Sequence, residues 1–116
     1  MNRRPRKQTD RIRYTDGLCT ILSVKDRKVL SVKGTDKPFA ERAVGSRRFW
    51  DAAIAGVQIV RTLYMPKDTD VAANDVLIIG SDQYTAVQVD LADRVRPVSK
   101  LVSLASSAIR YEYGDD

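Results

Sequence analysis

Histidine is absent from the 116-residue chain, and cysteine occurs once, at Cys19. Without histidine the chain lacks the usual general base, the Ser–His and Cys–His nucleophile pairs and imidazole metal ligands. The single cysteine excludes an internal disulfide, and its place in an alternating segment predicts a small buried residue rather than a reactive thiol. The sequence also has no CxxC, P-loop or GxGxxG motif. We therefore expect no enzyme activity, no cofactor and no metal site.

Long apolar runs are missing as well. A run such as residues 76–79 is far shorter than the ~20 residues that a membrane-spanning helix needs. Apolar residues nevertheless make up 43% of the chain, which is enough to build a core. The length suits one domain and not two. These features predict a single folded domain, made in the cytoplasm, with no membrane partner.

The net charge of +5 is concentrated at one end of the chain. Residues 1–13 hold six basic residues and one acidic residue, whereas the other 103 hold 14 of each sign. Such a basic segment is typical of a chain that meets an anionic partner, either nucleic acid or an acidic protein surface, and a solvated end is the alternative. The candidate contact residues are Arg3, Arg4, Arg6, Lys7, Arg11 and Arg13 in this arm, and Glu112, Asp115 and Asp116 in the acidic tail.

Short alternating or continuous apolar segments predict about six strands. The first two are expected to form one hairpin, and the fourth and fifth another. Arg61 interrupts the apolar face of the third strand, which indicates an edge or an interface. The fold class is therefore mainly β, a small antiparallel barrel or sandwich. The expected strands cover residues 18–24, 29–33, 57–65, 75–80, 83–90 and 98–105.

One segment has helical periodicity. Ser46 is a suitable N-cap, Trp50 and Ile54 lie one turn apart, and Gly56 can end the helix. These signals predict one short inserted α-helix over about residues 46–56, packed on the sheet through Phe49, Trp50 and Ile54. Residues 34–45 before it predict a long loop. The chain then divides into a basic arm (1–16), a barrel domain with the helix and loop (17–105) and an acidic tail (106–116).

The order of these elements resembles the head-tail joining proteins of long-tailed bacteriophages, specifically the head-closure or stopper family. The likeness covers about residues 18–105. It rests on a helix with an opening Gly-Ser pair, two early aromatic residues and a closing glycine, and on a later hairpin with an apolar strand, a glycine turn and a tyrosine. The residues that carry it are Gly45, Ser46, Phe49, Trp50 and Gly56, then residues 76–80, Tyr84, Ala86 and Val87.

This resemblance implies a structural protein of the phage neck. Such proteins form a homo-oligomeric ring beneath the portal and its adaptor ring, retain packaged DNA non-specifically and dock the tail terminator or other tail proteins. The resemblance also implies that the helix is a rigid prop, and that the loop before it faces the channel or a neighbouring ring. The candidate channel or docking residues are then Asp36, Lys37, Phe39, Glu41 and Arg42.

Two other functions stay open. One is a nucleic-acid-binding barrel of the OB or SH3-like type, with the arm tracking phosphates. The neutral body and the scarcity of strand aromatics, essentially Tyr64 and Tyr84, speak against a base-stacking face. The other is an adaptor or tail-terminator ring component of the same virion, since a fold alone does not fix function.

Overall fold

The structure, a computed structural model, describes residues 10–42 and 56–112. The predicted helix over residues 46–56 lies outside these ranges except for its last residue, Gly56. Gly56 has a φ of 81°, in the left-handed region. The inserted helix therefore stays a prediction.

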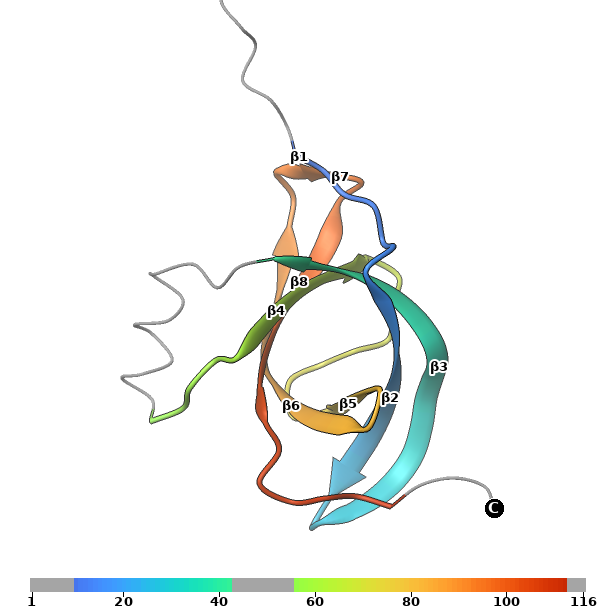
Figure 1. The fold of residues 1–116 in the computed structure, drawn as a ribbon, viewed down its shortest axis with the longest axis vertical. Helices are drawn as coiled ribbons and strands as arrows, with labels where there is room; N and C mark the ends of the chain where they lie inside the picture. The colour runs from blue at the N-terminus through green and yellow to red at the C-terminus, as the bar shows by residue number, and fades with distance from the viewer. Residues whose placement is uncertain (1–9, 43–55, 113–116) are drawn as a thin grey trace, which may run out of the picture.

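The described part of the chain is mainly β, as predicted. Six antiparallel strands close into a barrel in the order β2-β3-β4-β8-β6-β5, and β1 and β7 form a separate two-stranded parallel sheet (Figure 1). Closure of the sheet on itself identifies the fold as a barrel rather than a sandwich. The strands are β1 (Asp10–Arg11), β2 (Gly17–Lys25), β3 (Lys28–Arg42), β4 (Arg61–Pro66), β5 (Val76–Ile79), β6 (Asp82–Ala92), β7 (Val95–Arg96) and β8 (Ser99–Ser106).

Both predicted hairpins are confirmed. β2 and β3 are joined by a two-residue turn in which Asp26 and Arg27 both have positive φ, 55° and 67°. β5 and β6 are joined at Gly80 and Ser81, with Gly80 at a φ of 64°. Turns with positive φ match the right-handed twist of the flanking strands and fix the register of each hairpin.

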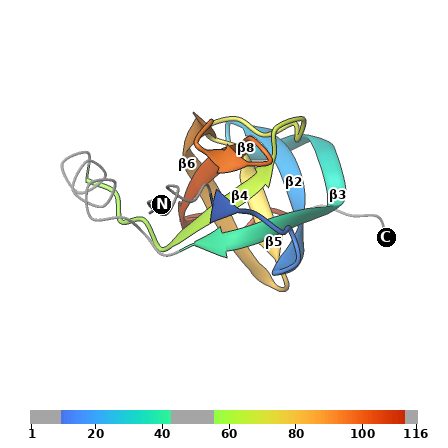
Figure 2. The ribbon, with the colours of Figure 1, turned by 90° about the horizontal axis from the view of Figure 1, so that it is seen from above.

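The predicted loop over residues 34–45 is wrong over residues 34–42, which continue β3. This strand has 15 residues against 9 in its partner β2. Three register shifts absorb three of the six extra residues, and the last three residues of β3 extend past β2. One of the shifts lies beside Asp36, whose φ is 53°. Bulges let Gly34 and Asp36 occupy a strand, and Pro38 pairs with Leu18 in a part of β3 that does not pair with β4. Residues that resemble a loop in sequence therefore still pair with β2. Residues 40–42 then pair with β4. Figure 2 shows β3 and β4 side by side, seen from above.

The main core fills the barrel. Leu63 and Met65 of β4 and Val102 and Leu104 of β8 are buried there, and so is Cys19, which is 2% exposed. Burial away from water raises the pKa of the Cys19 thiol to about 12. The prediction of a small buried residue at this position is confirmed. The fully buried members of the core include Ile21, Leu63, Met65, Leu77, Val102 and Leu104.

Three predicted boundaries change. β4 begins at Arg61 and not at residue 57, although Val60 N still donates to Leu104 O at 2.8 Å. The folded body includes residues 10–16 of the predicted arm, because Ile12 is 4% exposed and its N donates to Arg96 O at 2.8 Å. It also includes part of the predicted tail, since Tyr111 packs on an outer apolar cluster of β2 and β5.

Candidate functional site

Arg61 is the first residue of β4, and residues 43–60 separate it in the sequence from the end of β3. The last residue of β3, Arg42, pairs with Thr62 of β4, so the two ends of this segment are side by side. Arg61 Nε donates to Glu41 Oε2 at 2.9 Å, and Nη2 donates to Glu41 Oε1 at 2.6 Å. This two-bond geometry makes the pair directional as well as charged. It ties the start of β4 to the end of β3.

Aromatic rings flank the same guanidinium. Arg61 Cζ lies 5.3 Å from the centre of the Tyr84 ring and 6.0 Å from that of Phe39, and Nη1 donates to the Tyr84 hydroxyl at 3.3 Å. The hydrogen bond with Glu41 raises the pKa of Arg61 despite partial burial. Arg61 is therefore a permanent cation, and three of its five N–H donors are bound to Glu41 and Tyr84. The arrangement joins side chains of β3, β4 and β6.

The structure separates the five residues predicted to form a docking loop. Glu41 belongs to the Arg61 clamp, and Phe39 is 1% exposed in the barrel core. The Arg42 guanidinium lies 5.5 Å from the centre of the Tyr64 ring. Asp36 and Lys37 lie in the bulged middle of β3. Arg61 interrupts an apolar face, as predicted, but the predicted sheet edge is wrong, because β4 pairs with β3 on one side and with β8 on the other. The interface stays a prediction. The partner of Arg61, Glu41, lies in the segment predicted to be a loop.

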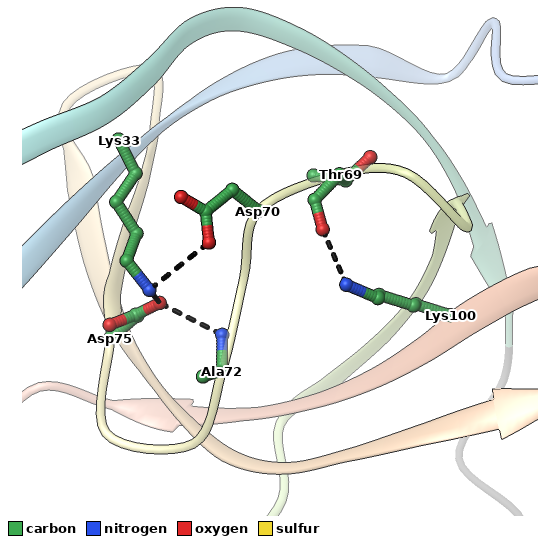
Figure 3. A network of polar contacts seen from close by, with 6 residues as sticks. All are labelled: Lys33, Thr69, Asp70, Ala72, Asp75 and Lys100. Atoms are coloured by element: carbon green, nitrogen blue, oxygen red, sulfur yellow. Dashed lines mark hydrogen bonds and ion pairs between the residues drawn. The ribbon is translucent and has the colours of Figure 1, made fainter.

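A second polar network holds residues 67–75 across the barrel (Figure 3). Lys33 Nζ lies 2.7 Å from Asp75 Oδ2 and 3.5 Å from Asp70 Oδ1, and the same Asp75 oxygen accepts a hydrogen bond from Ala72 N at 2.8 Å. Lys100 Nζ donates to Thr69 O at 2.6 Å. Sequence reasoning missed this network because Lys33 lies at a strand bulge, and no local pattern shows which way such a side chain turns.

The predicted arm and tail contacts are placed only in part. Arg11 and Arg13 are exposed, on either side of the buried Ile12. Glu112 is exposed at the end of the described chain, just after Tyr111, whose backbone N and O both bond to the Gln83 amide at 2.7 Å. The other predicted contact and helix residues lie outside the described ranges: Arg3, Arg4, Arg6, Lys7, Ser46, Phe49, Trp50, Ile54, Asp115 and Asp116.

Within residues 10–42 and 56–112, no three cysteine, aspartate or glutamate side chains lie close enough together to hold a metal ion. The same part of the chain contains no helix of the length and apolarity needed to cross a membrane. Comparison of the chain with protein-family models, with curated proteins and with solved structures found no match.

Proposed function

We propose that this chain is a structural virion protein of the phage neck, a subunit of a stopper-type connector ring that closes the filled capsid and docks the tail. The observation that carries the proposal is the clamp between Glu41 and Arg61. It ties the end of β3 to the start of β4, the two strands that residues 43–60 connect in the sequence. A ring subunit needs such a fixed point on its barrel, because a neighbouring ring can be met reproducibly only by a surface held in place.

The way in which charges are used supports a structural role over a catalytic one. Arg61 is paired with Glu41, and Lys33 with Asp75, so each of these groups is neutralised by a partner within the fold. Catalysis needs groups poised to act on a substrate, whereas these pairs fasten strands and a loop. The partners are then further copies of the chain, the portal or adaptor ring on one side and the tail terminator or tail proteins on the other.

The rival, a barrel that stacks bases on its strands, is disfavoured by the two strand tyrosines. Stacking requires an open ring face. Arg42 lies over the Tyr64 ring, and Arg61 lies over the Tyr84 ring. Tyr84 is further held by its hydrogen bond from Arg61. Neither ring is a free platform in this structure.

The test is ring formation on the portal. The purified chain is mixed with the portal complex of the phage that encodes it, and native mass spectrometry measures how many copies join. We expect a defined multiple with the parent chain. Arg61→Lys keeps the charge but loses the two-bond geometry, so it is expected to join poorly while its melting temperature falls only slightly. Arg27→Lys, an exposed change in the β2–β3 turn, is the matched control. A parent chain that stays monomeric with the portal contradicts the proposal.

A further inference from the structure

Two tripeptides of the same pattern, far apart in the sequence, lie side by side. They are residues 11–13, Arg-Ile-Arg, and residues 94–96, Arg-Val-Arg. β1 pairs with β7 in parallel, with Arg11 opposite Arg96. Ile12 and Val95 are 4% and 5% exposed and pack together with Ala40.

This packing determines where the arginines lie. Successive side chains of an extended segment point to opposite sides, so the residues that flank a buried one point outward. All four arginines are accordingly exposed. We name this set the arginine cap. Its members are Arg11, Arg13, Arg94 and Arg96.

The charges of the arginine cap are not neutralised within the described fold. None of its members forms an ion pair with a described carboxylate, in contrast to Arg61 and Lys33. Arg96 Nη1 donates to the backbone oxygens of Asp93 and Val95, at 2.9 and 2.8 Å, which holds the guanidinium in place and leaves its charge. Like charges directly opposite on neighbouring strands destabilise the pairing. An anionic ligand would relieve that repulsion.

We propose that the arginine cap binds the phosphate backbone of double-stranded DNA without sequence preference. This inference deepens the proposed function, on which it rests for the source of the DNA, the packaged genome. Guanidinium groups bind phosphate oxygens through paired hydrogen bonds. In the sequence, four more basic residues precede β1, namely Arg3, Arg4, Arg6 and Lys7.

The composition of the arginine cap favours DNA over an acidic protein surface. Stable protein interfaces are centred on apolar and aromatic side chains that become buried. Here the apolar members, Ile12 and Val95, are already buried inward, and arginines form the outer side. Recognition by charge with little apolar contact is typical of non-specific binding to the DNA backbone.

The experiment measures binding of the full chain to a fluorescent duplex of about 30 base pairs by anisotropy, over roughly 50–200 mM salt. The test variant is Arg11→Gln with Arg94→Gln, because neither side chain makes a hydrogen bond to a described residue, unlike that of Arg96. The control is Lys25→Gln with Lys28→Gln, two exposed lysines that pair at the β2–β3 turn. In Figure 1 this turn lies at the opposite end of the molecule from β1 and β7. Both variants remove two positive charges.

We expect the control to bind nearly as the parent does. The arginine cap variant should bind about ten- to hundredfold more weakly near 0.1 M salt, with a slope of log affinity against log salt smaller by about 2. Equal melting temperatures exclude misfolding as the cause. Equal binding by the two variants overturns the proposal. So does competition by polyglutamate as effective as that by unlabelled duplex at matched charge, since it would indicate an acidic protein partner.

The same measurements separate this inference from the proposed function. If the parent chain joins the portal and the arginine cap variant binds duplex as well as the lysine control variant does, the arginine cap is refuted as a DNA site. The neck function then stands. A chain that binds DNA through the arginine cap but does not join the portal refutes the neck function and leaves the DNA site standing.

Discussion

Lys33 and Asp75 meet across the barrel, with Lys33 Nζ 2.7 Å from Asp75 Oδ2, although 42 positions separate them in the sequence. Asp75 is only 6% exposed and receives a second hydrogen bond from Ala72 N. The pair joins the bulged strand β3 to the segment between β4 and β5. Since that segment spans the barrel, the pair helps to cover the core.

Lys33→Met should lower the free energy of unfolding by about 1–3 kcal/mol, because it leaves a buried carboxylate without its cation. Chemical unfolding monitored by circular dichroism measures the loss. Lys37→Met is the control on the same strand, since Lys37 forms no ion pair with any described residue, and its effect should be about 0.5 kcal/mol or less. Equal losses for the two variants would show that the pair with Asp75 contributes nothing specific.

The same pair predicts a dependence on alkaline pH. The hydrogen bond from Lys33 to Asp75 raises the pKa of Lys33 above its ordinary 10.5. The folded state therefore holds this proton more tightly than the unfolded state does. The resulting stability is present below pH 10.5 and is lost as pH rises through the folded pKa. The difference in the free energy of unfolding between the parent and Lys33→Met should then shrink as the pH rises above 10.5. A difference that stays constant would contradict its origin in the Lys33–Asp75 pair.

Cys19 should be inert while the chain is folded. Its thiol is 2% exposed, and burial raises its pKa to about 12, so little thiolate forms and reagents have no access to it. Labelling with a thiol reagent at neutral pH should therefore proceed only as fast as the barrel opens, and denaturant should accelerate it strongly. Labelling at the rate of a free thiol in native buffer would show that the barrel interior is accessible.

Trp50 is the single tryptophan of the chain, so its fluorescence reports on the predicted helix. If residues 46–56 form a helix that packs on the barrel, the emission should be blue-shifted and should move to longer wavelength on unfolding. Trp50→Ala should then cost roughly 3–5 kcal/mol. Native emission like that of free tryptophan, with a Trp50→Ala variant as stable as the parent, would refute the packed helix.

Local pattern was sufficient for the regular strands and failed where pairing is irregular. Alternation predicted β2 and β6, and a continuous apolar run predicted β5, because the core-facing residues of these strands are apolar. The residues Gly34, Asp36 and Pro38 predict a loop in what is the second half of β3, because no local pattern shows the bulges and the pairing with β2 that place them in a strand. Tertiary pairing decides such segments.

The charged contacts could be recognised only once the fold was known. Arg61 stood out in the sequence as a charge on an apolar face, but its partner Glu41 lies in the segment that the pattern assigned to a loop. Arg11 and Arg13 were candidates from charge alone. The parallel pairing of two strands of two residues each brings Arg94 and Arg96 beside them. Strands this short carry no periodicity that could be read from sequence.

The measurement that tests the central claim most directly is electron microscopy of phage particles made without this protein. An amber mutation in its gene, grown in a host that does not suppress it, removes the chain and leaves every other component in place. We predict tail-less heads that lose their DNA, free tails in the lysate, and restoration of infectious particles when the parent chain is supplied from a plasmid. Normal, tailed and DNA-filled particles at the usual titre would contradict a role in the connector.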